Sequence, residues 1–134
     1  MKQNIGYVAL VVRDYDEAID FYVNTLGFAL LEDTAIEAQN KRWVVVTPSQ
    51  TSGARILLAR ASNAAQMASV GNQTGGRVFL FLHTDDVLRD FERYRSLGVE
   101  FVRLPKDESY GRVAVFKDLY GNLWDLIQHN CGHA

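Results

Sequence analysis

The sequence predicts an α+β protein built from two copies of the element order βαβββ. Two observations support this prediction. Strand-like and helix-like apolar patterns follow one another in the same order in both halves of the chain. Short landmarks also recur in a common order: residues 8–14 correspond to residues 80–86, and Leu26-Gly27 corresponds to Leu97-Gly98. A shared order of elements and landmarks indicates an internal duplication, which sets the architecture.

The chain is long enough to bury one sizeable core, because it has 134 residues of which 48% are hydrophobic. We therefore expect a single domain over residues 1–134, with a first module of about residues 1–70 and a second of about residues 77–130. Residues 71–76 between the modules are Gly, Asn, Gln and Thr, the composition of a flexible connector.

The first module begins with a continuous apolar run at residues 5–12, which predicts a central strand that is covered on both faces. A short buried helix is the alternative that periodicity leaves open. Asp14 follows, with Glu17 three residues later in the spacing of a capping box, so a helix starts there. It ends near Gly27, which can adopt the left-handed conformation common after helices. Three strands at about residues 28–34, 42–47 and 54–59 complete this module.

The second module repeats this order after a short helix that Ser62 can cap and that runs to about Ser69. Asp86 is the predicted cap of the second module's helix. The elements that we expect are a strand at residues 78–83, a helix ending near residues 97–98, and strands near residues 99–104, 112–117 and 122–128.

Composition excludes several classes of partner. The formal charge is -2 and no run of Lys or Arg is present, so we do not expect nucleic acid to bind. The longest apolar runs, residues 8–12 and 78–82, are far shorter than the roughly 20 residues of a membrane-spanning helix. The N-terminus lacks the pattern of a signal peptide, so we expect a cytoplasmic protein. Cys131 is the single cysteine, which excludes an intramolecular disulfide.

Four segments of the chain carry a further pattern. They are Val8-x-Leu10-x-Val12-x-Asp14, Phe21-Tyr22, Leu26-Gly27-Phe28 and Phe116-x-Asp118-x-x-Gly121-Asn122-x-x-Asp125-Leu126. Together they resemble the vicinal oxygen chelate superfamily, which includes glyoxalases, bleomycin-resistance proteins and extradiol dioxygenases. The resemblance spans nearly the whole chain, and Leu119 stands where the family's closing turn usually has proline. It implies an open, cup-shaped mixed sheet with helices outside, a small molecule inside, and a homodimer.

The resemblance also implies where a metal would be held. Metalloenzymes of the family use four cup-facing His, Gln or Glu ligands, and these positions fall on Tyr7, Leu57, Phe79 and Asp125. Leu57 and Phe79 have no donor atom, and Tyr7 would have to bind as a phenolate. One carboxylate cannot supply the three protein ligands typical of an open catalytic site. We therefore expect no catalytic metal and no other cofactor.

Asp125 is the candidate catalytic residue. It stands among the apolar residues of the segment 123–127, where an unpaired carboxylate costs free energy or has a raised pKa. In a functional interpretation it faces the cup, where it accepts a hydrogen bond from a ligand or acts as a general base. In a structural interpretation it pairs with Arg42 or Arg112, or lies at a solvated edge.

Other candidate residues would contact the ligand. Side chains two apart share one face of a strand, so a cup-facing Phe79 would bring His83 to the same face. A solvated strand end is the alternative for His83, and a core or dimer-interface position is the alternative for Trp43 and Trp124. The guanidinium groups would suit an anionic ligand. The ligand-binding candidates are Tyr7, Arg42, Trp43, Phe79, Phe81, His83, Tyr110, Arg112 and Trp124.

The C-terminal tail has three potential metal donors in alternation, His129, Cys131 and His133. Short terminal segments are usually poorly ordered, and the sequence offers neither a fourth ligand nor supporting residues. We therefore interpret the tail as an incidental pattern.

Three functions remain open at this point. The first is a metal-free protein that binds a small molecule in an aromatic-lined cup, as the antibiotic-sequestering relatives do. The second is a lyase, isomerase or dioxygenase-like enzyme that uses Asp125, His83 or Tyr7, or an unorthodox metal site. The third is a regulatory or scaffolding dimer whose cup is filled by its own side chains.

Overall fold

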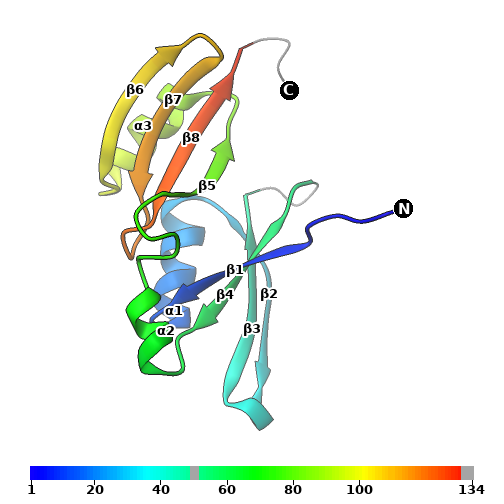
Figure 1. Cartoon of the computed structure of the whole chain (residues 1–134). Helices are drawn as coiled ribbons and strands as arrows, with labels where there is room; N and C mark the ends of the chain where they lie inside the picture. Colours follow the sequence, from blue (N-terminus) through cyan, green and yellow to red (C-terminus); the bar gives the residue numbers. More distant parts are fainter. Residues whose placement is uncertain (49–51, 131–134) are drawn as a thin grey trace. The chain divides into compact units, whose positions relative to one another are not determined.

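The computed structural model describes residues 1–48 and 52–130 (Figure 1). The chain divides into two compact units, Met1–Val70 and Gly71–Ala134. Each unit has one four-stranded mixed sheet and repeats the order βαβββ. The predicted α+β class and the duplicated order are therefore confirmed. Within the described ranges, no helix is long and apolar enough to cross a membrane.

The first unit has the strand order β1-β4-β3-β2, in which β1 is parallel to β4 and the other pairs are antiparallel. The prediction of a central first strand is wrong, because β1 is the terminal strand of this sheet and, among the described residues, pairs only with β4. The elements are β1 (Tyr7–Val12), α1 (Tyr15–Ile19), the π-helical segment η1 (Asp20–Thr25), β2 (Ala29–Ile36), the 3-10 turn η2 (Glu37–Gln39), β3 (Lys41–Thr47), β4 (Arg55–Arg60) and α2 (Ala64–Ser69).

The core of this unit lies between the sheet and the α1–η1 helix. Alternate residues of neighbouring strands point to the helix, and Leu10, Leu58 and Val44 are completely buried there. Ala18 and Tyr22 of the helix are equally buried and pack against them. The residues between these core positions on each strand point to the face opposite α1.

The helix start is as predicted, because Asp14 Oδ2 accepts a hydrogen bond of 2.8 Å from the Glu17 amide. The second half of the helix is π-helical, which the apolar pattern did not indicate: the Leu26 amide donates to the carbonyl of Phe21, five residues back. Gly27 ends the helix with φ 81°, the left-handed conformation expected of it.

The second unit has the equivalent strand order β5-β8-β7-β6, with β5 parallel to β8. Asp86 caps its helix by accepting a hydrogen bond of 3.0 Å from the Arg89 amide. Tyr94 of this helix packs on Phe116 of the sheet, and Phe91 packs on Phe101, whose ring contacts Phe116. Phe91, Tyr94 and Phe116 are buried. The elements are β5 (Val78–His83), α3 (Val87–Ser96), β6 (Phe101–Glu108), β7 (Gly111–Lys117) and β8 (Leu123–His129).

The closing turn of this unit explains why its sequence is Asp-x-x-Gly-Asn. Asp118 is 5% exposed, and its Oδ1 accepts the amides of Tyr120, Gly121 and Asn122 at 3.0–3.1 Å. Its Oδ2 accepts hydrogen bonds from the side chains of Asn122 and Trp124. Both oxygens of the buried carboxylate thus accept hydrogen bonds from protein donors, which offsets the cost of burying the charge.

The short helix α2 differs from the prediction in its cap. Asn63, not Ser62, is the N-cap, and its Oδ1 accepts a hydrogen bond of 2.8 Å from the Gln66 amide. Ser62 instead donates through its amide and hydroxyl to the Gln66 side-chain oxygen. Hydrogen bonds of both residues therefore stabilise the start of the helix, which lies one position later than the sequence suggested.

Candidate functional site

In the first unit, the face opposite α1 carries aromatic side chains. The rings of Tyr7 and Trp43 meet edge to face, with centroids 5.8 Å apart, although they come from β1 and β3. Tyr7 is 47% exposed and also lines a hollow of about 460 Å³ with Gly53, Ala54 and Arg55. Leu57 lies on the same face, because it is paired with Ala9 of β1 and Val45 of β3. On this face Tyr7 is therefore exposed, whereas Val45 beside Leu57 is buried.

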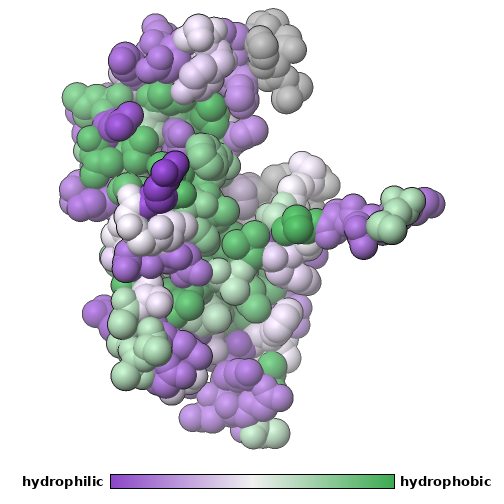
Figure 2. All heavy atoms as spheres, viewed as in Figure 1, coloured by the Kyte–Doolittle hydropathy of each residue, from purple (hydrophilic) through white to green (hydrophobic). Residues whose placement is uncertain are grey.

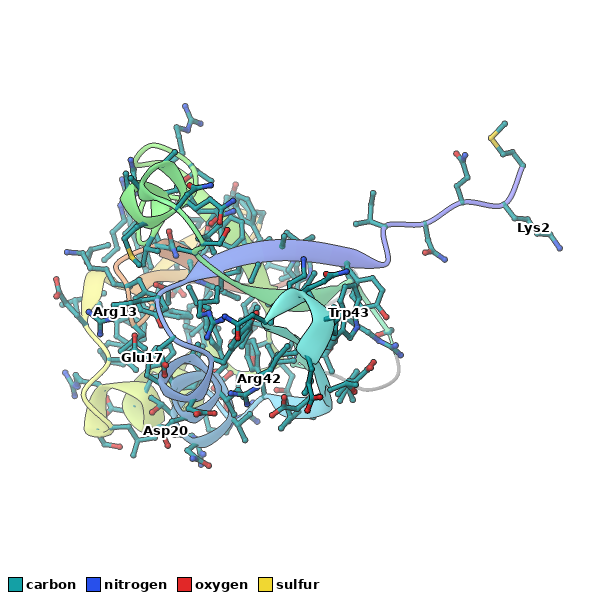
Figure 3. The ribbon with its side chains drawn as sticks, turned by 90° about the horizontal axis from the view of Figure 1, so that it is seen from below. Lys2, Arg13, Glu17, Asp20, Arg42 and Trp43 are labelled. Carbon is teal, nitrogen blue, oxygen red and sulfur yellow. The ribbon has the colours of Figure 1, made fainter. Side chains whose placement is uncertain are left out.

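Arg42 points to the opposite side from its neighbour Trp43, toward the helix, as Figure 3 shows. Its Nε and Nη2 donate to both carboxylate oxygens of Asp33 at 3.0 and 2.7 Å, and its Nη1 donates to Asp16 at 2.9 Å. The Arg42 hydrogen bonds hold the pKa of Asp33 below its ordinary value, and the same contacts raise the pKa of Arg42. Arg42 is therefore occupied by a structural ion pair in its own unit.

In the second unit, Asp125 lies in a cross-strand row on the face opposite α3. Its neighbours across the ladder are Phe81 of β5 and Val115 of β7, and Arg103 of β6 follows Val115. Phe81 is 61% exposed, whereas Val115 is 8% exposed. Figure 2 shows hydrophobic residues over the side of β6–β8 that faces the viewer. The carboxylate therefore lies between an exposed aromatic ring and a buried valine, with Arg103 beyond the valine.

The Asp125 carboxylate is not satisfied by the described part of the protein. Its Oδ1 is buried and has no hydrogen-bond partner among residues 1–48 and 52–130. Burial raises the pKa of Asp125, and the charge of Arg103 opposes that rise. An ordinary structural carboxylate in such a place has donors around it, as Asp118 does. Asp125 is thus set up to accept a hydrogen bond that the described residues do not supply.

The structural partners suggested for Asp125 are both bound to other carboxylates. Arg42 is held by Asp33 and Asp16. Arg112 pairs with Asp107 at 2.6 Å, and it lies one residue out of phase with Val115 and Val113 on β7, so it points to the α3 side. That interpretation is therefore wrong for both arginines.

The remaining candidates in the second unit divide between surface and core. The rings of His83 and His129 meet at 4.8 Å, at the ends of β5 and β8. Tyr110 precedes β7 and is 45% exposed. Trp124 is 2% exposed, which fits the core interpretation that the sequence left open. Phe79 lies at a register shift of β5 and contacts the Trp124 ring, so simple alternation does not place it with Phe81.

The donor chemistry at the family's metal positions does not fit a metal ion. Of the four positions, Leu57 and Phe79 have no donor atom. Of the other two, Tyr7 and Asp125, only Asp125 is a carboxylate. The described residues contain no group of three or more His, Cys, Asp or Glu side chains that could hold a metal. Cys131 and His133 of the tail pattern lie outside the described residues.

Comparisons with known proteins agree with this fold. The sequence profile of the glyoxalase/bleomycin resistance protein/dioxygenase superfamily matches residues 4–126. An uncharacterized protein of Shewanella frigidimarina (strain NCIMB 400) is 62% identical over 130 residues, which are 97% of this chain and 96% of the relative. The crystal structure of UcmS2 is similar with a TM-score of 0.82 and 27% identity, covering 95% of this chain and 98% of that chain.

A further solved structure, TnmS3, is an antibiotic binding protein from Streptomyces sp. CB03234. It is 30% identical to this chain with a TM-score of 0.76, and the similarity covers 96% of this chain and 98% of TnmS3. The profile match and these similarities cover nearly all of both modules. The chain belongs to the glyoxalase/bleomycin resistance protein/dioxygenase superfamily.

Proposed function

We propose that this protein binds a planar, partly apolar small molecule of the antibiotic type and does so without a catalytic metal. The observation that carries the proposal is the buried Asp125 Oδ1, which has no hydrogen-bond donor among the described residues and lies beside the exposed ring of Phe81. A ligand with a flat apolar body and an amine, amide or hydroxyl donor would cover the ring and satisfy this oxygen.

Three further findings support the proposal. TnmS3, which is 30% identical, is an antibiotic binding protein. In the first unit, Tyr7 and Trp43 supply a second aromatic surface on the face opposite α1. The absence of donor atoms at Leu57 and Phe79 supports binding without the family's metal. We propose further that the protein is a homodimer, as the resemblance implies, and that it works in the cytoplasm.

The binding test uses a panel of planar aromatic antibiotics that carry an N–H or O–H donor. We expect one class to raise the melting temperature and to bind saturably, because a ligand of the native state stabilises it. Asp125→Ala should weaken that ligand at least tenfold, the effect of losing a hydrogen bond to a charged group. Asp107→Ala is the matched control, since Asp107 is an exposed carboxylate of the same unit. Equal affinity in both variants would refute the role of Asp125.

The metal-free part of the proposal has its own test. Elemental analysis of protein purified without a chelator or an affinity tag should give less than stoichiometric Fe, Mn, Ni or Zn. Stoichiometric metal that is lost in Asp125→Ala would contradict this part of the proposal, whatever the antibiotic panel shows.

An enzyme is the second candidate function, and the same carboxylate favours it. Burial raises the pKa of Asp125, which makes it a stronger base than an exposed aspartate. A ligand identified in the panel would then be converted to product, at a rate that Asp125→Asn reduces by about 100-fold or more. Recovery of unchanged ligand after long incubation with the protein would exclude this function for that ligand.

A further inference from the structure

The sheet of the first unit divides at one end. β3 pairs with β4 only from Val46 to Val44; beyond that point β3 continues with β2 as far as Lys41, and β4 continues with β1 as far as Arg60. In Figure 1 the ribbons of β3 and β4 diverge toward η2 and α2. The equivalent strands of the second unit, β7 and β8, stay paired along the whole of β7. The first unit therefore has an interrupted ladder that its duplicate lacks.

Side chains occupy the interrupted ladder and keep the two strands apart. The backbone amide of Arg42 donates to the hydroxyl of Tyr15 at 3.2 Å instead of to β4. Arg60 Nη2 donates to the carbonyl of Asn40 at 2.7 Å from the other strand. The guanidinium groups of Arg42 and Arg60 both lie 5.1 Å from the centre of the buried Tyr15 ring. Because polar groups at the gap are bound in this way, the gap is part of the fold.

A cavity of about 420 Å³ opens at this gap, and we call it the β3–β4 slot. Its volume lies within the roughly 300–1,000 Å³ of typical small-molecule sites. Apolar side chains form part of the wall, among them Trp43, Leu57 and Ile36. The slot is thus a concave site with both aromatic and aliphatic surface.

The charges of the slot are all positive. Its lining includes Lys41, Arg42 and Arg60 and contains no Asp or Glu. Asp33 and Asp16 balance the charge of Arg42. In the described parts of the chain, neither Lys41 nor Arg60 forms an ion pair. Glu37 lines a smaller hollow next to it, of about 180 Å³. Two uncompensated cations beside an apolar wall favour an anionic ligand.

We propose that the β3–β4 slot binds a small organic anion, a carboxylate or phosphate ester on a flat apolar body. The anionic group is held by Lys41 and by the guanidinium N–H groups of Arg60 that Asn40 does not use. The apolar body lies against Trp43 and Leu57. This inference does not rest on Asp125, which carries the proposed function; the two proposals share Trp43, but the anion contacts, Lys41 and Arg60, belong to the slot alone.

The test is an NMR titration that follows the two tryptophan indole N–H groups. Trp43 lines the slot, whereas the Trp124 indole is buried and bonded to Asp118. Benzoate and phenyl phosphate serve as probes, with benzamide as the neutral analogue. We expect at least one anion to shift the Trp43 signal saturably, with Trp124 unchanged, and to bind at least tenfold tighter than benzamide. Which anion binds distinguishes a carboxylate site from a phosphate ester site.

Variants then test which cationic side chains hold the anionic group. Arg60→Gln should weaken the anion roughly tenfold, and Arg60→Lys should retain part of the affinity. Arg95→Gln is the matched control, because Arg95 also lies over an aromatic ring, 4.7 Å from the centre of Phe91. If Arg60→Gln does not fold, Lys41→Gln takes its place with the same expected loss.

Two results would overturn the inference. One is the lack of a saturable Trp43 shift with either anion, or equal affinity for benzamide. The other is full anion affinity in the folded Arg60 or Lys41 variant. Neither result bears on the comparison of Asp125→Ala with Asp107→Ala in the antibiotic panel, which tests the role of Asp125.

Discussion

Replacing Asp125 by asparagine should stabilise the free protein. The Asp125 Oδ1 atom is buried without a hydrogen-bond partner among the described residues, and leaving such a group unsatisfied costs about 1–3 kcal/mol. The side chain is only half-buried and feels the charge of Arg103, so we take the lower end of this range. Asp125→Asn removes the charge and keeps the shape. We expect a gain of about 1 kcal/mol at pH 7, or about 4 °C in melting temperature.

The pH dependence of this gain has a definite sign. The folded pKa of Asp125 is raised above the ordinary value of 3.8, so the folded state binds more protons than the unfolded state between the two values. The stability of the native protein therefore falls as the pH rises through that interval. The variant lacks this loss, so the difference between the proteins should be small near pH 4 and reach its full size at neutral pH.

The assay is urea unfolding followed by tryptophan fluorescence at several values between pH 4 and pH 7, for the native protein and Asp125→Asn in parallel. All other carboxylates titrate equally in both proteins, so the difference isolates Asp125. A variant that is less stable at pH 7, or a difference that does not change with pH, would refute the reasoning. If the variant is more stable but binds the antibiotic ligand more weakly, Asp125 is a residue kept for function at the expense of stability.

Three other changes probe the fold. Asp118→Asn should cost about 2–4 kcal/mol at neutral pH in the same assay, because one of the two accepting oxygens becomes a donor that faces other donors. Gly111→Ala should cost about 2 kcal/mol by urea unfolding, since φ is 157° and the new Cβ would lie 2.2 Å from the carbonyl oxygen of Gln128. Asp33→Asn should lower the stability by up to about 1 kcal/mol at pH 7. Because Arg42 lowers the pKa of Asp33 from 3.8, the stability difference between the two proteins should disappear when unfolding is measured at successively lower pH below 3.8.

Much of the fold is predictable from the sequence because its signals are local. The Asp14 and Asp86 caps and the left-handed Gly27 depend on residues within a few positions, and the structure has all three. The position of β1 at the end of its sheet was not predictable in this way. An apolar run indicates burial, but here β1 has one neighbouring strand in its own unit, and which strand that is depends on the topology.

The candidate site is less predictable because its partners are not local. The sequence favoured Arg42 or Arg112 as partners of Asp125, since guanidinium groups are the usual counterions of buried carboxylates. Arg42 binds Asp33 on the adjacent strand, and Arg112 points to the other face of its sheet. The register between strands decides which partner Arg42 binds and to which face Arg112 points. The charged residues in the sequence do not reveal that register.

The β3–β4 slot also could not be predicted from the sequence. Lys41 to Thr47 continues as one strand, so the composition gives no signal that pairing with β4 ends at Val44. The interruption comes from Tyr15, whose hydroxyl accepts the Arg42 amide, and Tyr15 belongs to the helix. Tyr15 is 3% exposed, so a core residue of the helix also satisfies a strand amide at the gap. The duplicate module, whose ladder is unbroken, shows that the βαβββ order does not require such a slot.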